Sequence, residues 1–359
     1  MFTIFRTLLL ACVVLLATSC SKQNSQLPEQ ATPLKEVADI YPDYRDIVAP
    51  PNIAPLDFMV KNEADEAMAH LVGGGKELIV EADENGTFRL DSLAWRDLLT
   101  AARGAQVEVT LYVKRKGDWH TLTPFHITVA QEPIDRYLSY RLIEPSYELY
   151  RQLGLYQRDL EGFGVTTIYE NNREYSQDDN HCINCHNYQN YSTERMLFHV
   201  RAKHGGTVFV ENGKPRKLNM KSDSILSSTV YPTWHPDRNW VVFSSNQTGQ
   251  VFHMKDPQKI EVVDYGSDLV FYDADRNELR NILKTEADLE TFPCWAPDGR
   301  RVFYCSAHVP EFVGKTAEQR QDIIGNIHNK VRYNLMSLPF DPATGKFGAP
   351  VVEMDCAAE

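Results

Sequence analysis

The sequence lacks a basic excess, lacks a catalytic signature, and lacks long apolar runs beyond its first twenty residues. Its 37 Lys and Arg against 49 Asp and Glu give a net charge of -12, so no nucleic acid partner is expected, because an acidic surface repels phosphate. No G-x-S-x-G, H-E-x-x-H or P-loop pattern occurs, so no catalytic residue is predicted and enzymatic activity stays open. A single apolar run of about ten residues excludes a polytopic membrane protein.

The apolar run, residues 8–17, has the length and position of a signal peptide, which we assign to 1–19. Cys20 follows small residues and resembles the acylated cysteine of bacterial lipoproteins; a plain secreted protein is the alternative. Residues 20–35 are polar and predict a lipid-anchored tether. Ser21, as the residue after the lipidated cysteine, implies a cell-envelope lipoprotein at the outer membrane, on its periplasmic or its surface face. The lipid would link the protein to the membrane.

Residues 36–135 contain short runs of alternating apolar and polar residues, such as 107–113, separated by turn residues. This spacing predicts a β-sandwich-like domain. One amphipathic stretch, Leu93–Ala102, predicts a short helix capped by Asp91 or Ser92. No residue pattern in this domain predicts a catalytic site.

Residues 136–186 are rich in tyrosine and are interpreted as an aromatic helical connector, with a helix expected after Pro145. From 187 to 359 the chain repeats itself, since residues 231–244 align with 292–305. Each copy is a strand, a Pro-Asp turn and a second apolar strand, which predicts β-hairpins within four-stranded units.

The repeat resembles the TolB-like, WD-repeat-like β-propeller family, whose blades carry P-x-W-S/A-P-D-G before an apolar strand. Pro293 to Gly299 fits this pattern closely, whereas Arg238 stands where the first copy would have glycine. Residues 196–218 indicate a third blade, and 165–172 a further strand. Because these propellers usually need about six or seven blades, the expected fold is mainly β: a sandwich-like domain, a haem-binding segment and a partial propeller.

The chemistry-bearing motif is Cys182-Ile183-Asn184-Cys185-His186, the C-x-x-C-H signature of c-type haem attachment. Cys182 and Cys185 would form thioethers to the two vinyl groups, and His186 would ligate the iron. Covalent attachment retains the cofactor outside the cytoplasm, which agrees with an exported protein. The cofactor predicted is therefore haem c.

Three other interpretations of the cysteine pair remain. A disulfide is permitted in an oxidising compartment, although it does not require His186. Half of a zinc site would need a second ligand pair at finger spacing. A thioredoxin-like redox pair would need a surrounding βαβ pattern. The segment 180–189 also resembles haem-bearing loops of exported propeller lipoproteins of the Bacteroidetes, which favours haem.

The sixth iron ligand would decide the redox behaviour. His199 is the first candidate and Met196 the second, with His204 and Met220 further along the chain. On a strand, His199 and Met196 face opposite sides, so only one can meet the iron. The alternative for each is a plain core or surface residue with no ligand role.

Three further residues look structural. His235 lies at a blade turn, and Cys294 and Cys305 lie on paired strands but out of direct register, which disfavours a disulfide.

These observations predict an exported lipoprotein with one covalent haem, acting in electron transfer or haem-linked redox chemistry. Its propeller would dock a redox or envelope protein partner. The alternative is a non-redox propeller lipoprotein that binds or scaffolds, with structural cysteines. An enzyme with an open haem iron, such as a peroxidase, is a third hypothesis, for which no distal acid–base pair is apparent.

Overall fold

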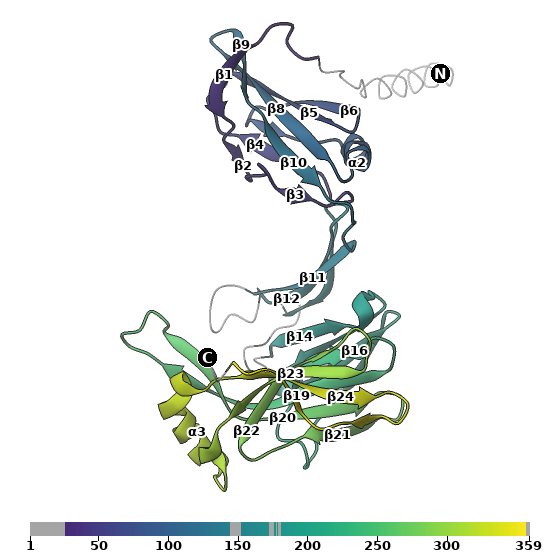
Figure 1. The fold of residues 1–359 in the computed structure, drawn as a ribbon, viewed down its shortest axis with the longest axis vertical. Helices are drawn as coiled ribbons and strands as arrows, with labels where there is room; N and C mark the ends of the chain where they lie inside the picture. Colours follow the sequence, from purple (N-terminus) through teal and green to yellow (C-terminus); the bar gives the residue numbers. More distant parts are fainter. Residues whose placement is uncertain (1–25, 144–151, 172–175, 177, 179–180, 357–359) are drawn as a thin grey trace, which may run out of the picture. The chain divides into compact units, whose positions relative to one another are not determined.

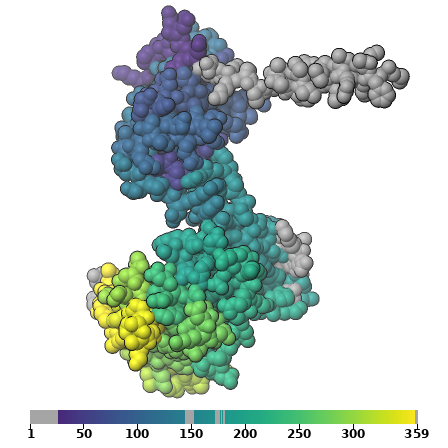
Figure 2. Space-filling view, turned by 90° about the vertical axis from the view of Figure 1, so that its right-hand side faces the viewer, coloured from purple at the N-terminus to yellow at the C-terminus, as the bar shows by residue number. Residues whose placement is uncertain are grey.

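A computed structural model describes residues 26–143, 152–171, 176, 178 and 181–356 of the chain (Figure 1). The predicted signal peptide, Cys20 and the helix expected after Pro145 lie outside the described residues. The chain forms two compact units, one ending at Leu138 and also holding Gln157–Thr166, the other formed by Ser139–Tyr156 and the chain from Thr167 onward. In Figure 2 most atoms of the first unit are purple to blue, and those of the second are teal to yellow.

The first unit is a β-sandwich with a small helix. Its larger sheet runs β1-β9-β8-β10-β3, with β5 pairing both β8 and β6, and its smaller sheet runs β2-β4-β7. The strands are β1 (Thr32–Val37), β2 (Ile40–Tyr41), β3 (Val48–Ala49), β4 (Phe58–Val60), β5 (Glu66–Gly73), β6 (Lys76–Glu81), β7 (Thr87–Phe88), β8 (Gln106–Arg115), β9 (Asp118–Thr123) and β10 (Phe125–Val129).

One core joins the two sheets. Alternate residues of β8 (Val107, Val109, Leu111 and Val113) are buried and belong to the same apolar cluster as Phe88 of the smaller sheet. Alternation with a period of two therefore directs one face of β8 inward, as the sequence predicts for this region.

The helix α2 (Ser92–Ala101) confirms the expected helix. The Asp91 side chain is its N-cap and accepts hydrogen bonds from the backbone N–H groups of Leu93 and Ala94. One boundary differs: the predicted tether to residue 35 overlaps β1, which begins at Thr32 and pairs in parallel with β9. Polar composition did not reveal this strand, because an edge strand can be mostly exposed.

The second unit consists of successive antiparallel sheets with the strand order of propeller blades. The first blade is β14 (Ile183–Tyr188), β15 (Arg195–Val200), β16 (Gly206–Glu211) and β17 (Lys214–Leu218). The second is β18 (Thr229–Trp234), β19 (Trp240–Phe252), β20 (Ile260–Asp273) and β21 (Glu278–Leu283). The third is β22 (Asp288–Trp295), β23 (Arg301–His308), β24 (Asn334–Asp341) and β25 (Lys346–Phe347), with β26 (Val351–Met354) on β24.

The partial propeller predicted from the sequence therefore has three blades of at least four strands in the described part of the chain. A three-stranded sheet precedes them, in the order β11 (Tyr137–Leu142), β12 (Gly154–Asp159) and β13 (Val165–Glu170). The expected strand at 165–172 corresponds to β13.

The expected domain boundary after His186 is wrong in position, because it falls inside β14. Ile183 of β14 is fully buried in a cluster with Met196, Phe198 and Val200 of β15. The C-x-x-C-H motif therefore lies at the start of the first blade, and not in a helical connector. The segment at 137–142 is likewise the strand β11. Sequence spacing missed both, because these strands are short and are stabilised by distant partners.

An insertion between β23 and β24 carries the 3₁₀ turn at Pro310–Phe312, the helix α3 (Ala317–Ile327) and a second 3₁₀ turn, η6 (His328–Lys330). Short 3₁₀ turns also follow β14 (Gln189–Tyr191) and β15 (Ala202–His204). Within the described residues, neither helix is of the length and apolar character that crossing a bilayer requires.

Candidate functional site

The C-x-x-C-H motif occupies a β-bulge that recurs in all three blades. The bulge residue has a left-handed backbone in each: Cys185 has a φ of 55°, Tyr231 of 48° and Phe292 of 55°. The pairing register shifts at the same point of each inner strand, between Asn184 and Asn187, between Val230 and Thr233, and between Thr291 and Cys294. Cys185 is therefore the structural equivalent of Tyr231 and Phe292.

Hydrogen bonds between neighbouring blades confirm this equivalence. The backbone N–H of Trp234 donates to Oδ1 of Asn187 at 3.0 Å. One blade further, the backbone N–H of Trp295 donates to Oγ1 of Thr233, also at 3.0 Å. Asn187 and Thr233 both lie two residues after the bulge residue of their blade. The same side-chain-to-backbone hydrogen bond therefore joins the first blade to the second and the second to the third.

Both thiols of the motif are half-buried, and neither is in a disulfide. Burial raises the pKa of Cys182, while the nearby guanidinium groups of Arg141 and Arg201 oppose the rise. The backbone N–H of Arg201 donates to the carbonyl of Cys182 at 2.8 Å. Nη1 of Arg141 donates to the carbonyl of Ile183 at 3.3 Å. Two cations therefore flank the motif.

The imidazole of His186 is uncharged at pH 7, because its pKa is lowered. Burial is the main cause that lowers its pKa, Arg141 acts in the same direction, and a hydrogen bond with the backbone of Ser139 opposes them. The imidazole is consequently neutral at pH 7 and has a lone pair to offer. A second hydrogen bond from a ligating histidine to the backbone is a common way to fix its orientation.

The two leading candidates for a sixth ligand lie on opposite faces of β15, as strand alternation predicts. Met196 packs with Phe198 in the cluster that also contains Leu155 of β12. His199 lies on the other face with Leu197, which packs against the second blade. Since His186 contacts the backbone of β11, it shares its side of the blade with Met196 and not with His199.

Neither candidate is available in this arrangement. His199 is 5% exposed and its Nδ1 lies 3.4 Å from Oγ1 of Thr207. Burial lowers the pKa of His199 to about 4, helped by Arg201 and Lys221. Met196 is a packed core residue, and Met220 is buried in the apolar cluster of the first two blades. His204 is exposed, with its ring 5.4 Å from the ring of His181.

The side chains at the bulges gather near the motif. The rings of Tyr231 and Phe292 are 4.6 Å apart and tilted by 56°. Burial raises the pKa of Tyr231, and the nearby Cys185 and Asp264 contribute to the rise. Phe292 is half exposed. An aromatic surface therefore lies beside the half-buried Cys185.

The side chains at and around the motif are of the types that a c-type haem would require: two thiols outside any disulfide, an imidazole, and two arginines that could pair with carboxylates. The motif predicted the thiols and the imidazole. Arg141, Arg201 and Ser139 were missed, because no local spacing indicates them. Arg201 follows β15, which pairs with β14, whereas Ser139 and Arg141 lie on β11 of a separate sheet.

The residues predicted to be structural behave as such. Nε2 of His235 lies 3.1 Å from the carbonyl of Gly299, and its Nδ1 accepts hydrogen bonds from the backbone of Asp237 and Arg238. Cys294 and Cys305 are both free, and each pairs with a different residue of the opposite strand.

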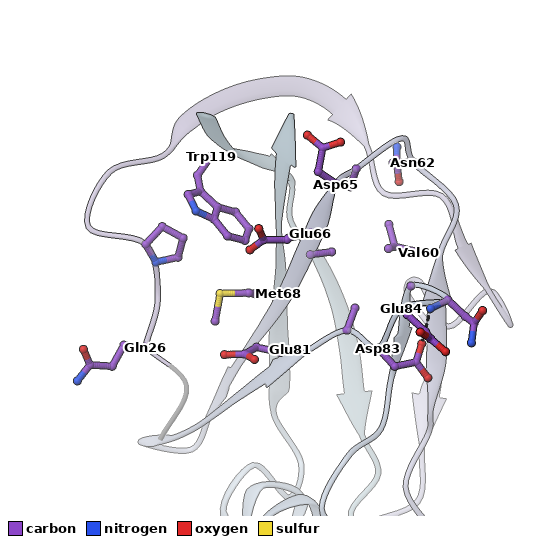
Figure 3. A pocket seen from close by; sticks show the side chains of 16 residues that line it. Gln26, Val60, Asn62, Asp65, Glu66, Met68, Glu81, Asp83, Glu84 and Trp119 are labelled. Atoms are coloured by element: carbon purple, nitrogen blue, oxygen red, sulfur yellow. Dashed lines mark hydrogen bonds between the residues drawn. The ribbon is translucent and has the colours of Figure 1, made fainter. Parts of the chain in front are cut away.

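A hollow in the first unit is acidic (Figure 3). Three of its carboxylates have partners: Asp83 accepts from the backbone of Asn85 and Thr87, Asp65 accepts from the backbone of Lys116, and Glu66 pairs with Lys114 at 2.8 Å. These contacts stabilise turns and strand edges, and they supply no ligand set.

No protein-family model and no curated protein matches the chain. Among solved structures, it is similar to tricorn protease, with 9% identity and a TM-score of 0.32 over 85% of this chain and 33% of that chain. It is also similar to the Dos1 propeller, with 10% identity and a TM-score of 0.30 over 90% of this chain and 88% of that chain. A structure of two prolyl endopeptidases gives 10% identity and a TM-score of 0.31, over 62% and 36%.

The chain spans about a third of the length of tricorn protease. These similarities are too weak to identify a family, and the assignment of propeller-like blades rests on strand order. The molecule is a mainly β protein with a sandwich-like unit and a unit of blade-like sheets.

Proposed function

We propose that this protein is an exported, lipid-anchored carrier of one covalently bound c-type haem that acts in electron transfer or haem-linked redox chemistry. The observation that carries the proposal is the position of Cys185 and His186. The same bulge is built from Tyr-Pro and Phe-Pro in the other two blades, so the fold does not require a cysteine and a histidine there. In this proposal they are present because Cys185 attaches the haem and His186 ligates its iron.

In this proposal the thiols of Cys182 and Cys185 each add across one vinyl group of the porphyrin. Sulfur bonds to the inner carbon and hydrogen to the terminal carbon, so the step consumes neither oxidant nor reductant. His186 would hold the iron through the ring nitrogen that Ser139 does not engage. Arg141 and Arg201 would offset the negative charge of the propionates. The bound haem supplies a one-electron redox centre.

The sequence supports the rest of the proposal. The apolar run at 8–17 and Cys20 support export to the cell envelope and attachment to a membrane by lipid. A single haem passes electrons only to a nearby acceptor, so a redox partner protein would dock on the blades.

The test is expression together with the c-type haem maturation machinery, followed by a visible spectrum after acid-acetone extraction. A Soret band that stays with the protein supports the proposal, and a colourless protein contradicts it. His186→Ala is the companion variant. Because His186 is part of neither thioether, we expect the haem attached to this variant to show an altered reduced spectrum.

The alternative is a non-redox propeller that binds a partner, with cysteines that serve packing. It is favoured by one observation: Cys185 sits where Tyr231 and Phe292 have a packing role. A colourless, folded protein whose stability is unchanged in the presence of haem would favour this alternative.

A further inference from the structure

The second blade has a long hairpin that extends beyond its neighbours. β19 and β20 pair along their full length, from Trp240 with Asp273 to Phe252 with Ile260. The neighbouring strands stop earlier, since β18 pairs only as far as Ser245. Helix α3 from the third blade packs against this extension through Ile324, in an apolar cluster that includes Val263 of β20.

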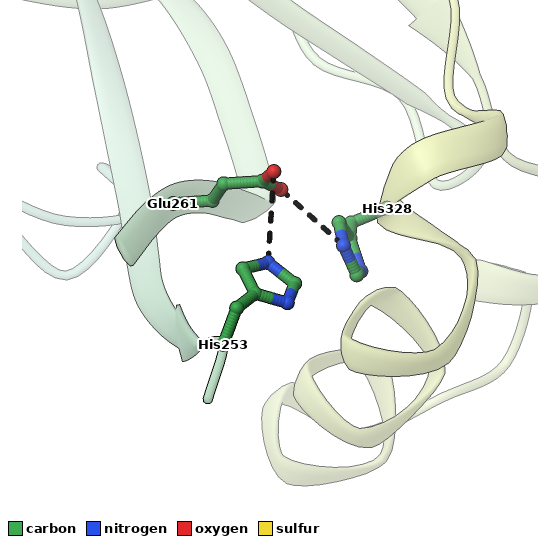
Figure 4. A group of neighbouring side chains, drawn as sticks. All are labelled: His253, Glu261 and His328. Carbon is green, nitrogen blue, oxygen red and sulfur yellow. Dashed lines mark ion pairs between the residues drawn. The ribbon is translucent and has the colours of Figure 1, made fainter. Parts of the chain in front are cut away.

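Three side chains converge where the hairpin meets the insertion (Figure 4). His253 directly follows β19, Glu261 lies on β20, and His328 lies at the end of α3. Nε2 of His253 is 3.6 Å from Oε1 of Glu261, and Nε2 of His328 is 3.3 Å from Oε2. One ligand atom from each lies within 4.8 Å of the other two.

The orientation of both histidines suits a metal. Nδ1 of His328 faces the carbonyl of Gly325 at 3.2 Å, which leaves Nε2 directed at Glu261. Nε2 of His253 is buried and has no hydrogen-bond partner among the described residues, because its carboxylate neighbour is too distant. A buried polar atom without a partner costs about 1–3 kcal/mol. A metal ion between the three side chains would satisfy it.

We propose that His253, Glu261 and His328 bind one divalent transition-metal ion, with zinc as the best match. Two imidazoles and one carboxylate form a borderline-soft donor set, which zinc prefers and which calcium and magnesium do not. Three protein ligands leave a fourth position for water or an exogenous ligand. Glu261 and His328 also line a cavity of ≈ 600 Å³ with aromatic and apolar neighbours, which has room for such a ligand.

The site has a structural consequence. It joins the hairpin of the second blade to the insertion of the third, two segments that are otherwise held by apolar packing. Bound metal would therefore stabilise the folded chain, since it binds the native arrangement and not the unfolded one.

The experiment is a zinc titration of the full chain after removal of metals with a chelator. We expect one zinc per chain with a dissociation constant below about 1 µM, and a rise in the unfolding temperature. His328→Ala and Glu261→Gln should weaken binding at least about tenfold. His308→Ala is the matched control, because His308 pairs with Asp288 elsewhere on the third blade and its loss should leave zinc binding unchanged.

The thiols of the C-x-x-C-H motif are the competing zinc ligands, so the titration is repeated on the Cys182→Ala, Cys185→Ala double variant. Zinc that persists in the double variant and weakens in Glu261→Gln supports the proposal. Zinc that disappears with the cysteines, or is unchanged in Glu261→Gln, overturns it. Circular dichroism shows whether His328→Ala folds, and the nearly isosteric Glu261→Gln decides if it does not. The result is independent of haem attachment.

Discussion

The first blade and the two blades after it have the same bulge conformation, but they differ in the residue types at the bulge. All three have a bulge with a left-handed residue on the inner strand, and consecutive blades are joined by the same side-chain-to-backbone hydrogen bond. The second and third blades place an aromatic residue and proline at the bulge, Tyr231-Pro232 and Phe292-Pro293. The first places Cys185-His186 there.

This difference distinguishes the backbone conformation that the fold requires from the side chains that can vary at that position. A left-handed φ is uncommon for residues other than glycine, so the bulge is a fixed feature of the blade and not a result of the residues in it. Proline restricts the two later bulges, whereas His186 supplies a nitrogen lone pair. The first blade therefore differs from the other two by side chains that can act as ligands at the same bulge.

The largest expected effect concerns the thiols. Cys182→Ala and Cys185→Ala together should abolish covalent haem, because no thioether can then form. Each single variant should retain at most one thioether and a shifted absorption spectrum. The measurement is haem stain on a denaturing gel after co-expression with the maturation machinery.

Cys294→Ala is the control for the comparison, since Cys294 is a thiol near the equivalent bulge of the third blade. It should leave haem content unchanged. Equal loss of haem in the Cys294 variant would show that haem attachment does not depend specifically on the thiols of the first blade.

The next largest effect concerns the pH dependence of stability and the position two residues before the bulge residue. This position is Ile183 in the first blade, Thr229 in the second and Glu290 in the third. All three are buried. Burial raises the pKa of Glu290 to about 8, and the neighbouring Asp268 and Asp288 add to the rise. The folded protein thus keeps a proton that the unfolded chain loses near pH 4.5, so stability falls as the pH rises from about 4.5 through 8.

Glu290→Gln should remove this part of the pH dependence. We expect the variant to be more stable than the parent at pH 9 by a few kcal/mol, at about 1.4 kcal/mol per pKa unit, and similar to it at pH 4. Denaturant unfolding at both pH values measures the difference. A parent and a variant with parallel pH profiles would contradict the assignment of Glu290 as a buried, protonated acid.

The smallest effect tests the bonds between blades. Asn187→Ala and Thr233→Ala each leave a backbone N–H of a buried tryptophan without its acceptor, which should cost about 1–3 kcal/mol. Because the two bonds are equivalent, the costs should agree within about 1 kcal/mol. Cys294→Ala, at the same position of the third blade, should change stability by less than about 0.5 kcal/mol.

Much of the fold could be predicted because its signals are local. Alternation in residues 107–113, the Asp91 cap and the Pro-Asp turns at 236–237 and 297–298 each involve a few adjacent residues. The position of the motif could not be predicted, because Ile183 to Tyr188 becomes a strand only through pairing with β15. The His253, Glu261 and His328 cluster was missed for the same reason, since its members come from three separate segments.

The most direct test of the haem account is the mass of the proteolytic peptide that contains Cys182, Cys185 and His186, taken from protein matured in an exporting host. We predict a peptide heavier by the mass of one haem, with no unmodified thiol detected by alkylation. An unmodified peptide with two alkylated cysteines, from protein that is folded and was exported beside an active maturation system, would contradict the account.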